Sequence, residues 1–141
     1  MLEVRYEGGV YLPTQDLWLD PHQPKAFAFV SHAHSDHIAP HQEIIVSERT
    51  SRLMQARMPG ERHEHILPFD QPTAVNGLNV TLLPAGHIFG SAQFFLEADA
   101  GTLLSTGDLN FLAVRADVPT KWRVRRTMPM ETTLGDPSLR V

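Results

Sequence analysis

The chain has 141 residues, a formal net charge of −4, 42% hydrophobic and 20% charged residues, and no cysteine. This length predicts one domain, residues 1–141, with its own hydrophobic core. The negative charge excludes a general affinity for nucleic acid without a local basic patch, and the missing cysteines exclude disulfides and thiolate metal sites. Because no apolar run could span a bilayer and the first residues lack a signal-peptide pattern, we expect a soluble, cytoplasmic protein.

Four stretches in the first 30 residues have the length and pattern of β-strands: residues 2–6, 10–12, 17–19 and 26–30. The pair Gly8-Gly9 predicts a turn between the first two, and Asp20-Pro21 ends the third. Residues 26–30 are continuously apolar, which is typical of a strand buried on both faces. This strand leads directly into a group of histidines.

Residues 31–37, Ser-His-Ala-His-Ser-Asp-His, contain three histidines and one carboxylate. Imidazole nitrogen and carboxylate oxygen are ligands of zinc and similar divalent metals. His32 and His34 lie two apart and can point the same way on an extended chain, whereas Asp36 and His37 follow on a turn and can face a second point. Solvated loop histidines are the alternative, but four candidate ligands in one short span disfavour it. The pattern suits two neighbouring metals better than one.

The next segment predicts a short strand followed by a helix. Residues 44–46 are apolar and form a buried strand, and Ser47 is a suitable N-cap. Residues 48–58 have the spacing of a helix with an apolar side. We expect Met54 on that side to pack in the core.

A second histidine pair lies in the polar segment 61–72. His63 and His65 form a His-x-His pair, which is a second set of candidate metal ligands. No apolar strand leads into this pair, and loop histidines are usually exposed and unliganded. We therefore expect a surface loop here.

Two further predicted strands end at candidate ligands. Residues 78–83 have a strand pattern and are followed by Pro-Ala-Gly-His87, and residues 92–97 and 102–105 predict a hairpin whose second arm leads to Asp108. Alone, either residue would be interpreted as an ordinary polar or turn residue. Because three predicted strands end in metal-ligand side chains, we expect them to converge on one site.

These motifs resemble the metallo-β-lactamase superfamily. The resemblance rests on His-x-His-x-Asp-His at 32–37, Pro-Ala-Gly-His-Ile-Phe-Gly-Ser-Ala-Gln at 84–93 and Thr-Gly-Asp at 106–108. Leu-Trp-Leu-Asp-Pro at 17–21 and Gly-His-Ile-Phe-Gly-Ser-Ala at 86–92 are more similar to its β-CASP nuclease branch, which includes mRNA 3′-end processing endonucleases and DNA ligase-associated exonucleases. The resemblance implies an α/β fold, the sheet-rich N-terminal half of an αββα sandwich without the β-CASP insert.

The resemblance also implies ligand roles for six residues: a first metal held by His32, His34 and His87, a second held by Asp36 and His37, and both held by Asp108. It implies two zinc ions and a phosphodiesterase that cleaves DNA or RNA. Asp36, His37 and Asp108 would then stand at the catalytic centre, where a water between the ions is activated.

The last 30 residues depart from the family pattern. Residues 130–137 resemble a strand end of the family, but the segment before them is charged and broken by Pro129, and two later histidines of the family have no counterpart. We therefore expect a fragment of a longer nuclease, a chain that completes its sheet with a second copy, or a shortened descendant that holds metal without catalysis. Half a sandwich leaves an apolar face and an open edge, which predicts a homo-oligomer.

The same region contains a candidate nucleic-acid contact, which consists of Lys121, Trp122, Arg123, Arg125 and Arg126. Cations can bind phosphates, and the indole can stack on a base. A solvated charged face is the more common interpretation of such a run.

Two other functions are compatible with the same ligands. A small-molecule hydrolase of the thioesterase or lactonase type would not cleave nucleic acid, and a non-catalytic metal-binding module would turn over nothing. The motif at 86–92 favours the nuclease.

Overall fold

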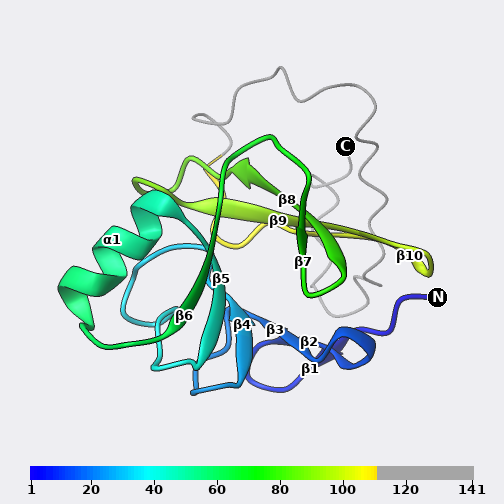
Figure 1. The fold of residues 1–141 in the computed structure, drawn as a ribbon, viewed down its shortest axis with the longest axis horizontal. Helices are drawn as coiled ribbons and strands as arrows, with labels where there is room; N and C mark the ends of the chain where they lie inside the picture. The colour runs from blue at the N-terminus through cyan, green and yellow to red at the C-terminus, as the bar shows by residue number, and fades with distance from the viewer. Residues whose placement is uncertain (111–141) are drawn as a thin grey trace, which may run out of the picture.

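The computed structural model describes residues 1–110. In this part of the chain ten strands form two sheets, with one α-helix, α1 (Glu48–Arg57), and one 3₁₀ helix, η1 (Pro13–Gln15), between strands (Figure 1). No helix in residues 1–110 is long and apolar enough to cross a membrane.

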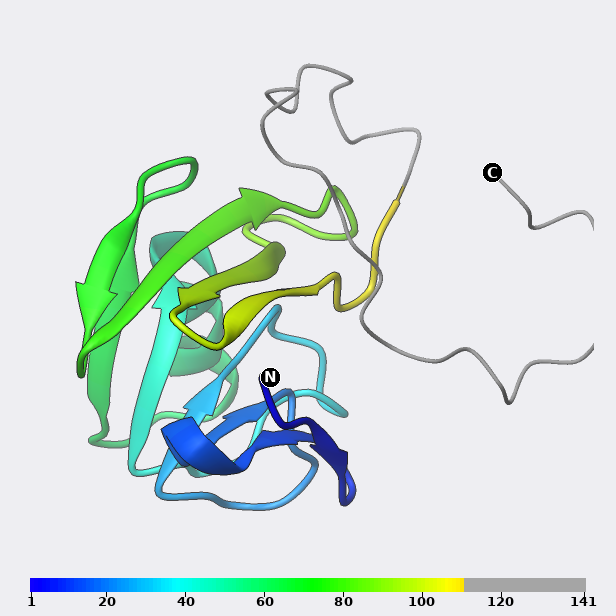
Figure 2. The ribbon, with the colours of Figure 1, turned by 90° about the vertical axis from the view of Figure 1, so that its right-hand side faces the viewer.

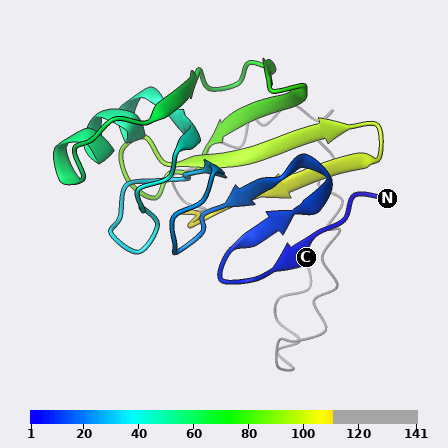
Figure 3. The same ribbon diagram turned by 60° about the horizontal axis from the view of Figure 1, so that its bottom comes forward.

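The first sheet has six strands that follow one another in chain order: β1 (Arg5–Tyr6), β2 (Val10–Leu12), β3 (Leu17–Leu19), β4 (Phe27–Phe29), β5 (Glu43–Ser47) and β6 (His63–Leu67). β1 to β3 pair antiparallel, whereas β3 to β6 pair parallel (Figure 3). Parallel neighbours end at the same edge of a sheet, so the segments that leave β3 and β4 emerge side by side.

The second sheet has four antiparallel strands in the order β10-β9-β8-β7: β7 (Thr73–Val75), β8 (Leu78–Pro84), β9 (Ala92–Ala98) and β10 (Gly101–Ser105). The turn between β7 and β8 is Asn76-Gly77, whose φ angles are +49° and +78°. Asn-Gly adopts positive φ at little cost, and two-residue hairpin turns of this kind match the twist of the strands.

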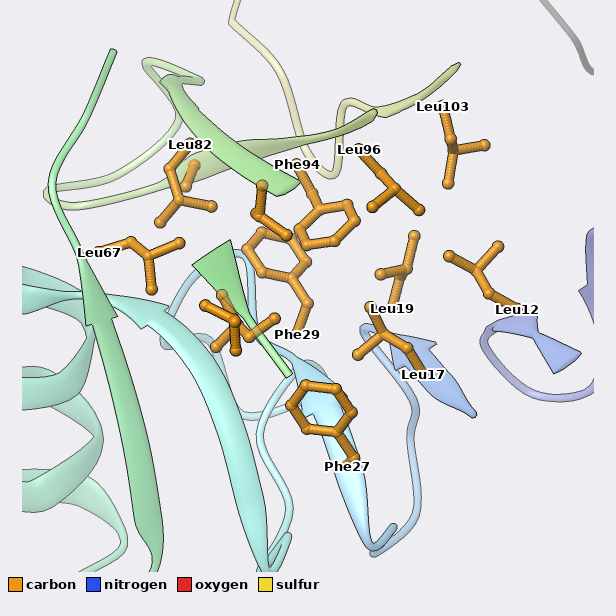
Figure 4. Packing of buried hydrophobic residues seen from close by; sticks show 14 residues of the cluster. Leu12, Leu17, Leu19, Phe27, Phe29, Leu67, Leu82, Phe94, Leu96 and Leu103 are labelled. Carbon is orange, nitrogen blue, oxygen red and sulfur yellow. The ribbon is translucent and has the colours of Figure 1, made fainter. Parts of the chain in front are cut away.

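The two sheets pack face to face around a shared apolar core (Figure 4). Phe29 of β4 and Phe94 of β9 are fully buried, and their ring centroids lie 4.9 Å apart. Tilted aromatic pairs of this kind stabilise a core beyond the area that they bury. Because Phe29 lies two residues before Ser31, this contact holds the end of β4 against the second sheet.

Helix α1 covers the opposite face of the six-stranded sheet. Met54 on the helix is fully buried against Ile44 and Val46 of β5. The helix begins at the predicted cap, because the Ser47 hydroxyl accepts a hydrogen bond from the Thr50 backbone N–H at 3.2 Å. Residues 1–110 therefore form three layers, helix, sheet and sheet, which confirms the expected strand-rich α/β fold.

Most predicted elements are confirmed within one or two residues: the strands at 10–12, 17–19, 26–30, 44–46, 78–83, 92–97 and 102–105 and the helix at 48–58. The first strand is shorter than predicted. The surface loop expected around His63 and His65 is wrong, because these residues lie in strand β6. In residues 1–110 β6 lies at the edge of the sheet, and Leu67 is its one buried residue, so it has no apolar run to reveal it.

Candidate metal centre

Three segments that leave the sheets bring four candidate ligands together. Residues 31–37 follow β4, residues 85–91 follow β8, and residues 106–108 follow β10 (Figure 2). One ligand atom from each of His32, His34, His87 and Asp108 lies within 4.8 Å of the others. The expected convergence of three strand ends is therefore present in the fold.

The distances within this group fit a metal-binding geometry. His32 Nε2 and His87 Nε2 lie 3.0 and 3.2 Å from His34 Nδ1, and Asp108 Oδ2 lies 3.7 and 3.5 Å from the same two Nε2 atoms. Ligand atoms about 2.0 Å from a tetrahedral zinc ion are separated from one another by about 3.3 Å. Three nitrogens and one carboxylate oxygen in this arrangement could hold a divalent ion.

His32 is positioned and kept neutral by its surroundings. Its side chain is fully buried, and Nδ1 lies 2.9 Å from Ser31 Oγ, which leaves Nε2 facing the other ligands. Burial disfavours the charged imidazolium and lowers the pKa of His32 to about 4. A neutral ring that donates from Nδ1 to the Ser31 hydroxyl presents a free lone pair at Nε2, the form that metals require.

His37 and Asp36 form a second group beside the first. His37 Nε2 lies 3.6 Å from Asp36 Oδ2 and 3.7 Å from Asp108 Oδ2, and the His37 and His32 ring centroids are 4.2 Å apart. Asp108 Oδ2 thus stands within 3.7 Å of imidazole nitrogens from both groups. Asp36 is largely exposed, and a backbone hydrogen bond lowers the pKa of its carboxyl.

Asp20 is a site residue whose role the sequence did not reveal. It follows β3, where its Oδ1 accepts a hydrogen bond from the Ser31 backbone N–H at 2.7 Å and lies 3.6 Å from His37 Nδ1. The nearby carboxylate raises the pKa of His37. The signal was available, because Asp20 ends a predicted strand as His32 and His87 do, but only the pairing of β3 with β4 brings it beside Ser31.

The loop that carries His87 is held by a dense set of hydrogen bonds. Ser91 Oγ accepts from the backbone N–H groups of His87 and Ile88 at 3.0 and 3.2 Å. The Gly90 carbonyl accepts from the hydroxyls of Ser47 and Thr50 at 2.6 and 3.0 Å, which ties the loop to the start of α1. A ligand on such a loop is held in place before any metal binds.

The predicted nucleic-acid contact at Lys121, Trp122, Arg123, Arg125 and Arg126 lies outside the described residues. The structure therefore places the six predicted metal ligands but not these cations and the indole.

No family model matches the chain. A probable DNA ligase from Opitutus terrae is 47% identical over 137 residues, which is 96% of this chain and 14% of that protein. The 5′ exonuclease Apollo of Mus musculus is 30% identical over 97 residues, 59% of this chain and 18% of that protein. Protein artemis of Gallus gallus is 25% identical over 142 residues, 77% of this chain and 20% of that protein.

The chain thus spans between 14% and 20% of the length of these relatives. The similarity covers residues that form both sheets and the metal-ligand cluster. The chain is homologous to the N-terminal region of the β-CASP metallo-β-lactamase nucleases, the group of DNA ligase-associated exonuclease, Apollo and Artemis.

Proposed function

We propose that this chain provides the metal centre of a zinc-dependent phosphodiesterase that cleaves nucleic acid. The observation that carries the proposal is the place of Asp108, whose Oδ2 lies 3.5 to 3.7 Å from nitrogens of His32, His87 and His37. A carboxylate that lies between a group of three imidazoles and the imidazole of His37 is suited to bridge two ions. Nitrogen and oxygen donors without sulfur are a usual set for catalytic zinc.

In this proposal one ion is held by His32, His34 and His87 and a second by Asp36 and His37, with Asp108 shared. When bound, such a pair of ions activates water near neutral pH and stabilises the charge that develops on a phosphodiester. The residues around them keep the ligands in position: Ser31 orients His32, Asp20 faces His37, and Ser91 holds the His87 loop.

Nucleic acid is the proposed substrate because of the relatives and because of one surface feature. Phe89 is 65% exposed, lies two residues after His87, and has the guanidinium of Arg49 4.3 Å from its ring centroid. An exposed aromatic ring can stack on a base while a neighbouring cation binds phosphate. This pair therefore offers a strand of nucleic acid a contact close to the metal centre.

Metal content and cleavage assays test the proposal together. Zinc bound per chain would be measured by elemental mass spectrometry after buffer exchange, and cleavage would be followed on end-labelled single- and double-stranded DNA and RNA with and without chelator. Asp108→Asn keeps the shape of the side chain and removes its charge, and Asp99→Asn in the exposed β9–β10 turn is the matched control.

We expect about two zinc ions at this centre, as a two-metal hydrolase requires, and chelator-sensitive cleavage that Asp108→Asn abolishes and Asp99→Asn leaves intact. Zinc binding without cleavage of any of these substrates would contradict the nuclease proposal and indicate a non-catalytic metal-binding module. Absence of bound zinc in the folded protein would overturn the metal centre itself.

A further inference from the structure

A second group of metal-ligand side chains lies on strands β5 and β6. His63 and His65 alternate along β6 and so project from the same face, and Glu43 of β5 pairs directly with His63 in the sheet register. One ligand atom from each of Glu43, His63 and His65 lies within 4.8 Å of the others. Two imidazoles and one carboxylate are a ligand set that zinc uses in proteins.

This group lies at the opposite end of the sheet from the candidate metal centre. Glu43 and His63 are the first residues of β5 and β6, whereas the candidate metal centre lies beyond the last residues of β4, β8 and β10 (Figure 1). The two groups share no residue. A metal bound at one would therefore be held independently of the other.

Hydrogen bonds within the group account for the positions of Glu43 and His65 but not for that of the His63 imidazole. Glu43 Oε1 lies 2.5 Å from His65 Nε2 and accepts from Asn76 Nδ2 at 2.8 Å, so those two side chains already satisfy it. His63 Nδ1 lies 3.6 Å from the same oxygen, beyond hydrogen-bond distance, and its ring centroid is 4.5 Å from that of His65. The 3.6 Å between His63 Nδ1 and Glu43 Oε1 is close to the separation of two ligand atoms on one ion, and a bound ion would replace the hydrogen bond between His65 and Glu43.

We propose that Glu43, His63 and His65 form a second, structural site for a divalent metal such as zinc. The His63 side chain is 68% exposed and that of His65 20%, so water can complete the coordination. Asn76 holds the carboxylate in position and belongs to the β7–β8 turn of the other sheet. A metal here fastens edge strand β6 to β5 and, through Asn76, fastens the two sheets to each other.

The test compares zinc binding by His63→Ala with that by His22→Ala, a control that removes another exposed imidazole. Because His63 is exposed and donates no hydrogen bond to Glu43, its removal is expected to leave the fold intact, which circular dichroism would verify. Bound zinc at buffered free-zinc concentrations and the zinc-dependent shift in Tm would be measured for both variants and for the unaltered chain.

We expect His63→Ala to bind about one zinc ion fewer per chain at saturation and to lose part of the zinc-dependent rise in Tm. His22→Ala should behave as the unaltered chain does. Equal zinc stoichiometry and equal Tm shifts in the two variants would overturn the proposal. Glu43 and His65 would then form only a hydrogen-bonded pair, and His63 would have no part in metal binding. Asp108→Asn separates the two sites, because it should reduce zinc at the candidate metal centre without changing the loss caused by His63→Ala.

Discussion

At the scale of single residues, the candidate metal centre depends on side chains that hold ligands as well as on the ligands. Asp20 connects the His32 group of ligands with the His37 group, because its carboxylate accepts a hydrogen bond from the Ser31 backbone N–H and faces His37. Ser31 in turn lies beside the His32 ring. Removing a residue that supports a metal ligand commonly lowers metal affinity by about 10- to 100-fold. Asp20 and Ser31 are therefore as open to test as the histidines.

Replacing Asp20 with asparagine should lower the pKa of His37 toward its ordinary value. Asp20 is the largest cause of the raised pKa, and asparagine can still accept from the Ser31 N–H while it lacks the charge. The measurement is an NMR titration of the imidazole resonances in metal-free protein. Asp99→Asn, distant in the β9–β10 turn, should leave the His37 titration as it is; an unchanged pKa in Asp20→Asn would refute the assigned contact.

The burial of the His41 imidazole predicts that the protein loses stability in mild acid. Its side chain is buried, its Nδ1 accepts from the Lys25 backbone N–H at 3.1 Å, and burial lowers its pKa to about 4. The unfolded chain takes up this proton near pH 6.5, so the contribution to stability is complete above that pH and falls between about 6.5 and about 4. The expected loss is at most about 3 kcal/mol.

Urea unfolding at several pH values would measure that loss as a difference between the unaltered chain and His41→Gln. The difference cancels the contributions of His32 and His37, which titrate in both proteins. The unaltered chain should lose more free energy of unfolding between pH 7 and pH 4.5 than the variant. Parallel pH profiles would show that His41 does not carry the effect.

At the scale of elements, the His87 loop fits against the start of α1 only because residue 90 is glycine. Gly90 has φ of +87°, and a Cβ there would lie 2.7 Å from Arg49 Cβ and 2.9 Å from the Thr50 backbone nitrogen. Both the backbone conformation and the space exclude a side chain. The close approach lets Ser47 and Thr50 bind the Gly90 carbonyl.

Gly90→Ala should therefore shift the loop, lower zinc affinity and destabilise the fold by about 2 kcal/mol or more, the sum of left-handed strain and the clash. Gly8→Ala is the matched control, because Gly8 has φ of +69° but no atom within 4 Å of an added Cβ. The control should show the backbone cost alone and normal zinc binding. Equal zinc affinity in the two variants would contradict a positioning role for this contact.

At the scale of the whole molecule, the hydrophobic core that stabilises the fold also positions the segment that carries the metal ligands. Phe29 and Phe94 join the two sheets, and the chain passes from Phe29 to His32 in three residues.

The homo-oligomer predicted from the half sandwich stays a prediction. Light scattering coupled to size-exclusion chromatography would measure it, and a monomer at high concentration would refute it.

Phe94→Ala should cost about 3 to 5 kcal/mol of unfolding free energy, as removal of a buried aromatic ring usually does. Because Phe94 contacts the strand that leads to His32, zinc affinity should fall in the fraction that remains folded. Phe89→Ala is the matched aromatic control: Phe89 is exposed, so its removal should change stability by less than about 0.5 kcal/mol. Denaturant unfolding of both variants provides the comparison.

The sequence by itself determined where the ligands stand along the chain. Each of His32, His87 and Asp108 follows an apolar or alternating stretch of strand length, and such stretches are recognisable without neighbours because burial selects their residues. Ser47 was recognisable as a helix cap for a similar reason, since capping is a local interaction. Local chemistry was enough for these features.

Tertiary structure alone decided the features that depend on neighbours. β6 is a strand because it pairs with β5 at the edge of the sheet that residues 1–110 form, where polar residues such as His63 and His65 are tolerated and no apolar pattern forms. Glu43 comes beside those histidines through sheet register, over a distance in sequence that no local pattern spans. Asp20 faces His37 for the same reason, because parallel pairing of β3 with β4 sets which strand ends are adjacent.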